Sequence, residues 1–143
     1  MLKILIKFVL LSIFITSYSF AEIIKEIKIT GNKRISVETI SVIGAIKLNT
    51  EYDNDSLNGV LKNLYNSNFF KDVNVNLNKG LLEINVIENP IIEDIEITGL
   101  KNKSFAEKLY ENITLKSRMS FTELQLENDV TLISNIMKSN GFY

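Results

Sequence analysis

Carboxylates are the main residues in this 143-residue chain whose types and spacing could do chemistry. The sequence contains no histidine and no cysteine, which excludes the commonest zinc ligands, cysteine nucleophiles, histidine-based triads and structural disulfides. An acidic loop at residues 53–55 could bind a cation. The acidic run of Glu93, Asp94 and Glu96 could supply paired carboxylates for acid–base catalysis. Each cluster has to be weighed against a structural role.

The acidic loop at residues 53–55 lacks the spacing of a calcium-binding EF-hand. Such a loop needs an oxygen ligand at its fifth position and a glutamate at its twelfth, and here those positions hold Leu57 and Leu64. Acidic and amide side chains directly before an apolar helical pattern are typical of a helix N-cap. We therefore expect this loop to begin a helix, capped by Asp55 or Ser56, and not to hold a metal.

The run that contains Glu93 and Asp94 is an equally poor catalytic pair. Adjacent residues of a strand point to opposite faces, so these two carboxylates could not act together on one substrate. The solvated face of a predicted strand explains them. We therefore predict that the chain is not an enzyme and holds no cofactor and no metal. Its net charge of -1 gives no electrostatic footprint for nucleic acid.

The first 21 residues have the layout of a secretory signal peptide. Lys3 and Lys7 form a basic start, an apolar run follows at residues 8–15, and small residues stand at positions -3 and -1 of a cleavage site after Ala21. The apolar run is far shorter than the ~20 residues of a membrane-spanning helix. We expect residues 1–21 to be removed and the mature chain to be exported. The lack of cysteine favours a bacterial periplasm.

A repeat organises the rest of the chain. Residues 23–36 match residues 91–104 at eight of fourteen positions, including the run Ile-Thr-Gly and the closing serine. The correspondence extends, with a few inserted residues, to two aromatic corners between a helix and a strand. We expect the aromatic residues of both corners to anchor the core: Phe69, Phe70, Phe142 and Tyr143.

Each copy of the repeat predicts the same series of elements. Alternating apolar residues at 27–29 and 95–97 are typical of a strand with one buried face, and the Thr-Gly that follows allows a turn. A short helix then begins at Ser36, or at Ser104 with Glu107 completing a capping box. A second helix carries an apolar stripe on one face. The stripes are Leu57, Val60, Leu61, Leu64 and Tyr65 in the first copy, and Leu126, Val130, Ile133 and Met137 in the second, where Ser120 and Glu123 are expected to cap the helix.

A β-hairpin closes the first copy of the repeat only. Residues 73–77 and 82–86 alternate apolar and polar side chains around a turn at residues 78–80. The unit is therefore an α+β fold of order β-α-α-β-β. The second copy ends before the equivalent hairpin, so we expect an incomplete second domain. The predicted organisation is a signal peptide at 1–21, a first domain at 22–90 and a second at 91–143, joined at the only proline.

The sequence resembles the POTRA-domain family of BamA-type outer-membrane protein assembly factors. Three segments carry the resemblance: residues 29–35 (ITGNKRI), 64–75 (LYNSNFFKDVNV) and 82–92 (LEINVIENPII). One departure is Asn68, where the family usually has the glycine that the second copy keeps as Gly141. Asparagine tolerates the left-handed backbone region best after glycine, so the turn can survive. The resemblance implies tandem POTRA domains, each a three-stranded mixed sheet with two helices on one face.

The resemblance also implies a location and partners. It implies a scaffold on the periplasmic side of the outer membrane, which receives unfolded outer-membrane proteins and passes them toward a β-barrel that inserts them. The expected partners are these clients, periplasmic chaperones, accessory lipoproteins of the assembly complex and the protein's own C-terminal membrane β-barrel. Alternatives are the POTRA region of a translocation and assembly module, of a two-partner secretion transporter, or of a cell-division protein.

The outer arm of the hairpin is the candidate client-binding segment. In β-augmentation an extended client adds a strand to an exposed sheet edge through backbone hydrogen bonds, which do not depend on sequence. The apolar side chains of this arm are expected to face the core, so a client would meet the backbone. The candidate residues are Val73, Asn74, Val75, Asn76 and Leu77.

Overall fold

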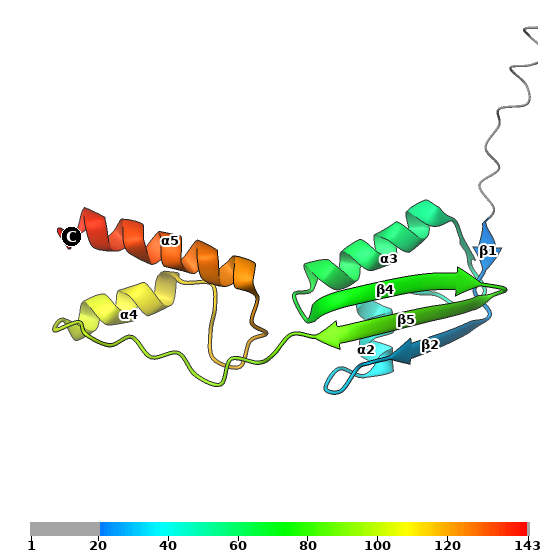
Figure 1. Cartoon of the computed structure of the whole chain (residues 1–143), viewed down its shortest axis with the longest axis horizontal. Helices are drawn as coiled ribbons and strands as arrows, with labels where there is room; N and C mark the ends of the chain where they lie inside the picture. Colours follow the sequence, from blue (N-terminus) through cyan, green and yellow to red (C-terminus); the bar gives the residue numbers. More distant parts are fainter. Residues whose placement is uncertain (1–20, 143) are drawn as a thin grey trace, which may run out of the picture.

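A computed structural model describes residues 21–142, in which two groups of elements follow one another along the chain (Figure 1). The predicted signal peptide lies outside the described residues, apart from Ala21. The first group consists of β1 (Glu22–Ile23), β2 (Glu26–Thr30), α2 (Val37–Ile43), β3 (Glu51–Tyr52), α3 (Asn54–Asn66), β4 (Phe70–Asn78) and β5 (Leu81–Glu88). The second group consists of α4 (Lys103–Asn112) and α5 (Glu123–Ser139).

The first group forms a three-stranded mixed sheet of order β2-β5-β4. β2 runs parallel to β5, with Ile29 opposite Ile84, and β4 runs antiparallel to β5, with Val75 opposite the same Ile84. The hairpin turns at Lys79 and Gly80, which have φ angles of 52° and 83°. Positive φ at both positions is the type I′ geometry that matches the twist of a hairpin. The predicted β-α-α-β-β order and mixed sheet are confirmed.

Both helices of the first group pack on the same face of this sheet. Leu64 of α3, Ile40 of α2 and Ile84 of β5 are all fully buried in one cluster. The apolar side chains at 82, 84 and 86 point into this cluster, and the intervening residues of β5 are exposed or half-buried. The period-two pattern of β5 and the helical stripe of α3 therefore meet face to face, as the sequence predicts.

The helix starts differ from the predicted ones at three of four positions. Ser36 caps α2 by accepting from the N–H of Thr39 at 3.2 Å, as expected. The expected caps, which were Asp55 or Ser56 for α3, Ser104 for α4 and Ser120 for α5, are wrong. Asp53 caps α3, Asn102 caps α4 and Thr122 caps α5, each accepting from the N–H three residues on. In each case several capping residue types stand within a few positions, and the turn that enters the helix selects among them.

The second copy of the repeat does not form its predicted strand. Residues 95–97 have no strand pairing, and the described part of this copy contains two helices with one isolated bridge, between Ile91 and Ser120. The strand prediction is therefore wrong for this chain. A strand exists only when a neighbour completes its hydrogen bonds, and the segment that pairs with β2 in the first copy has no counterpart within residues 91–142.

The aromatic corners are less buried than expected. Phe70 is a core residue with 3% exposure, but Phe69 and Phe142 are 38% and 46% exposed. Phe142 stacks on Phe105 of α4 with ring centroids 5.6 Å apart, and Tyr143 lies outside the described residues.

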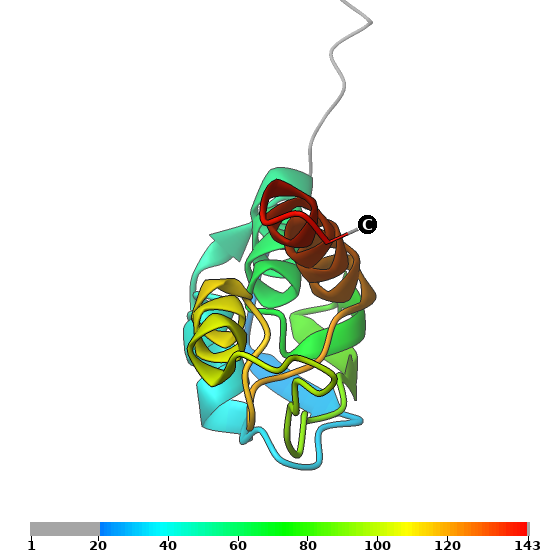
Figure 2. The same cartoon turned by 90° about the vertical axis from the view of Figure 1, so that its left-hand side faces the viewer.

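Figure 2 shows α4 and α5 lying beside each other without a covering sheet. Within residues 21–142, no helix has the length and apolar character to cross a membrane.

Candidate functional site

The candidate site is the free edge of β4. This strand lies at one end of the sheet and, within the described part of the chain, pairs with β5 alone. A client that adds a strand needs N–H and C=O groups that the sheet leaves unused. All five residues of the predicted client-binding segment lie in β4: Val73, Asn74, Val75, Asn76 and Leu77.

The hairpin register decides which backbone groups of β4 face away from β5. A two-residue turn is closed by a hydrogen-bonded pair, here Asn78 and Leu81, and bonded and non-bonded pairs then alternate along an antiparallel ladder. The non-bonded positions are Val73, Val75 and Leu77, so their N–H and C=O groups point outward. Among the described residues, no backbone hydrogen bond from outside the β4–β5 ladder reaches Val75 or Leu77.

The side chains of these outward-facing residues belong to the core. Val73 is 6% exposed, and Val75 and Leu77 pack against the buried cluster. Asn74 and Asn76 are exposed on the opposite face of the sheet. A chain that approaches this edge therefore meets backbone groups, whose pairing does not depend on the sequence of the partner.

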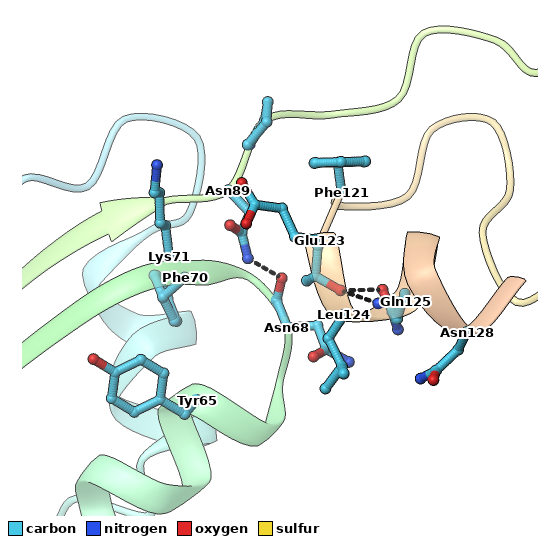
Figure 3. Close-up of a pocket in the computed structure, with 12 residues that line it drawn as sticks. Tyr65, Asn68, Phe70, Lys71, Asn89, Phe121, Glu123, Leu124, Gln125 and Asn128 are labelled. Atoms are coloured by element: carbon cyan, nitrogen blue, oxygen red, sulfur yellow. Dashed lines mark hydrogen bonds between the residues drawn. The ribbon is translucent and has the colours of Figure 1, made fainter. Parts of the chain in front are cut away.

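A groove of about 820 Å³ lies at the N-terminal end of β4, where the two groups of elements meet (Figure 3). Tyr65 of α3 and Phe70 of β4 line one wall, and the first turn of α5 lines the other. Its apolar part includes Pro90, Phe121 and Leu124. No local sequence pattern indicates this groove, because its walls come from segments far apart in the chain.

The joint between the two groups is hydrogen-bonded on both sides. The backbone N–H of Asn89 donates to the carbonyl of Phe69 at 2.8 Å, and its side chain donates to the carbonyl of Asn68 at 2.9 Å. On the other side, the N–H of Phe121 donates to the carbonyl of Pro90 at 2.8 Å. These contacts hold the floor of the groove against both groups.

A buried carboxylate anchors the first group beside this joint. The side chain of Glu88 is 7% exposed and accepts from the backbone N–H groups of Lys33, Arg34 and Ile35 at 2.8 to 3.0 Å. The Arg34 guanidinium lies 3.2 Å from the same carboxylate. Burial alone would raise the pKa of Glu88, but these N–H groups and the Arg34 charge outweigh it, and the pKa is lowered. The carboxylate is therefore held ionised.

The acidic clusters of the sequence have structural partners. Asp53 caps α3, as described, and Asp94 accepts from the Ser117 hydroxyl at 2.8 Å, a hydrogen bond that lowers the pKa of Asp94. Glu93 and Asp94 lie outside any strand, so the predicted strand face does not account for them. Among the residues that the structure describes, no three acidic side chains converge in a way that could hold a metal ion.

Asp129 is a buried acid that no motif in the sequence singles out. It lies in α5 with 4% exposure and accepts from the backbone N–H groups of Thr114 and Leu115 at 2.7 and 2.8 Å. These bonds satisfy backbone donors in the loop after α4. Asp129 therefore joins α4 to α5 and takes no part in the strand edge.

Known proteins are similar to this chain in sequence or in fold. The sequence profile of the POTRA family, described as a surface antigen variable number repeat, matches residues 22–89. The outer membrane protein assembly factor BamA of Neorickettsia risticii (strain Illinois) is 30% identical over 129 residues, which make up 90% of this chain and 17% of that protein. The BamA of Neisseria meningitidis serogroup B is 29% identical over 109 residues, 75% of this chain and 14% of that protein. The chain thus spans a small part of either relative.

A solved structure of POTRA domains 1–3 of the periplasmic domain of Omp85 from Anabaena has a similar fold. Its TM-score is 0.56 at 9% sequence identity, and the match covers 87% of this chain and 53% of that chain. The element order, the mixed sheet and the shared helix face agree with this likeness. Residues 22–89 of this chain therefore form a POTRA domain.

Proposed function

We propose that this chain is a periplasmic, non-catalytic POTRA scaffold of an outer-membrane protein assembly machine, and that it receives unfolded outer-membrane proteins. The POTRA domain at residues 22–89 and two relatives named as assembly factors support this proposal. These names favour an assembly factor over a two-partner secretion transporter or a cell-division protein. The partners in this proposal are unfolded clients, periplasmic chaperones, accessory lipoproteins and a C-terminal β-barrel of the same protein.

The client binds by β-augmentation at β4. The observation that carries this part of the proposal is the outward direction of the backbone groups of Val75 and Leu77 at a sheet edge. An unfolded outer-membrane protein offers many extended segments with alternating apolar and polar residues. Such a segment pairs with β4 in either direction, because the hydrogen bonds come from the backbone.

A pair of variants at one position tests this proposal. Val75→Pro removes the outward N–H, while Val75→Ala truncates the side chain and keeps that N–H. Binding of the chain to a synthetic peptide with the alternating pattern of a barrel strand is followed by NMR titration. We expect Val75→Ala to bind like the wild type and Val75→Pro to bind about 10-fold more weakly, as loss of a backbone hydrogen bond implies.

The same titration can also refute the proposal. If all three proteins bind the peptide equally, the peptide does not pair with β4 and the proposed site is wrong. Circular dichroism of each variant checks that the sheet is retained, and a peptide with N-methylated backbone nitrogens controls for binding through side chains.

A further inference from the structure

Tyr65 closes one end of the free edge of β4. Its hydroxyl donates to the carboxylate Oδ1 of Asp72 at 3.0 Å and accepts from the backbone N–H of Val73 at 3.1 Å. Val73 is one of the three residues whose backbone groups point away from β5. The contact from Tyr65 therefore occupies a donor that a client strand would otherwise use, and it agrees independently with the hairpin register.

The position of Tyr65 separates the strand edge from the groove. Beyond Val73, toward the start of β4, lie Phe70 and Lys71, which line the groove together with Tyr65 (Figure 3). On the other side of Tyr65, Val75 and Leu77 remain open. Tyr65 thus lies between the open part of the edge and the groove.

The two hydrogen bonds of the Tyr65 hydroxyl can be replaced by bonds to water. Its side chain is 40% exposed, although it belongs to the stripe of α3 whose other members are buried or half-buried. Water can replace both hydrogen bonds of its hydroxyl when the ring moves. A net hydrogen bond of this kind contributes roughly 0.5–1.5 kcal/mol, so a client can compete with it.

We propose that Tyr65 is a gate that sets how long a client strand β4 accepts. This inference rests on the proposed client binding at β4. A short strand pairs with Val75 and Leu77 while the gate is closed. A longer strand displaces the Tyr65 hydroxyl, pairs with Val73 as well and continues into the groove, where Phe121 and Leu124 offer an apolar wall. Long strands therefore bind at a disadvantage that the hydroxyl imposes, and removal of the hydroxyl favours them selectively.

The test compares Tyr65→Phe with Tyr110→Phe in the full chain. Tyr65→Phe removes only the hydroxyl, and Tyr110→Phe removes a hydroxyl from α4, away from the edge. Each protein is titrated by NMR with two alternating peptides, one of about five residues that covers Val75 and Leu77 and one of about nine residues that reaches past Val73. We expect Tyr65→Phe to bind the long peptide roughly 2- to 10-fold more tightly, with the short peptide and the Tyr110→Phe control unchanged.

The outcomes separate the gate from the proposed function. If the wild type binds both peptides and Tyr65→Phe leaves both affinities unchanged, the gate is wrong and client binding at β4 stands. If no protein binds either peptide, the proposed site itself is wrong, and the gate falls with it. Amide exchange in the free proteins adds a direct check: the Val73 N–H should exchange faster in Tyr65→Phe, and an unchanged rate would overturn the gate whatever the affinities are.

Discussion

The two copies of the repeat have similar sequences and different structures. Residues 23–36 and 91–104 agree at eight of fourteen positions, yet the first copy forms β2 and the second forms no strand within the described residues. In the first copy β2 is paired along its length with β5, and both helices cover the resulting sheet. In the second copy no strand covers the two helices within the described residues, and Leu124 and Val130 are largely exposed.

This difference shows that the repeated strand depends on a partner distant in the sequence. The alternating Ile-x-Ile-Thr-Gly pattern makes a strand possible, but the hydrogen bonds that stabilise it come from a segment more distant in the chain. The helices need less from their neighbours, because their backbone hydrogen bonds are internal.

The glycine that ends the repeated strand pattern has a different environment in each copy. Gly31 and Gly99 have φ angles of 85° and 83°, but a Cβ on Gly31 would overlap the carbonyl oxygen of Val86, and a Cβ on Gly99 would meet nothing within 4 Å. We expect Gly31→Ala to reduce the free energy of unfolding by about 3–5 kcal/mol, from backbone strain and overlap together, and Gly99→Ala by about 1 kcal/mol.

Urea unfolding measures both glycine variants, followed through the NMR signals of β5 for Gly31→Ala and of α5 for Gly99→Ala. Equal losses for Gly31→Ala and Gly99→Ala would contradict the comparison, because they would mean that both turns pack against a sheet to the same extent.

The apolar stripes of α3 and α5 differ in what they contact. Leu64 is fully buried under the sheet, and Leu126 is 43% exposed. Leu64→Ala should lower the free energy of unfolding of the first copy by about 3 kcal/mol, since it leaves a cavity in a packed core. Leu126→Ala should change the stability of the second copy by less than about 0.5 kcal/mol. Thermal unfolding by circular dichroism compares the two, and a loss at Leu126 as large as that at Leu64 would show that α5 has a packed partner.

The turn after the repeated motif is anchored by a carboxylate in the first copy. Glu88→Gln keeps the shape of that side chain and removes its charge, so we expect a loss of about 1–2 kcal/mol near neutral pH. Because the pKa of Glu88 is lowered in the folded state, its contribution is present above the ordinary glutamate pKa of about 4.3 and disappears as the pH falls through the folded value.

The free energies of unfolding of the wild type and Glu88→Gln should therefore become equal at acidic pH. Glu83→Gln is the matched control, because Glu83 pairs with Lys28 on the surface and such exposed pairs contribute little. A difference between wild type and Glu88→Gln that stays constant down to about pH 3, below the ordinary glutamate pKa, would be inconsistent with the anchor.

Periodicity predicted most of the first copy and less of the second. The stripe of α3, the alternation of β4 and β5 and the turn at Lys79 and Gly80 are local patterns, and all of them occur as predicted. The small β1–β3 pair and the choice of Asp53 as the α3 cap depend on how the chain passes between the helices, which no local pattern encodes. The strand expected at residues 95–97 does not form, because an alternating pattern alone does not provide the neighbouring strand that it needs.

The candidate site was predictable in part. The 73–77 segment forms the outer arm of a hairpin, and this position alone is enough to predict that it lies at a sheet edge, where β4 is found. The Tyr65 contact was not predictable, because the sequence pattern places Tyr65 in the apolar stripe of a helix. Its hydroxyl reaches the edge only when α3 packs on β4. The groove likewise depends on the joint at Asn89 and Pro90, which brings α5 to the end of the strand.

Client binding at β4 is tested most directly by amide hydrogen exchange, resolved by residue, in the presence of an unfolded outer-membrane protein segment. We expect the outward N–H groups of Val75 and Leu77 to become protected when the segment is added. Asn74 and Asn76, which already bond to β5, should exchange slowly with and without it. Protection that appears along β2 or α5 and leaves Val75 and Leu77 unchanged would contradict the claim that β4 receives the client.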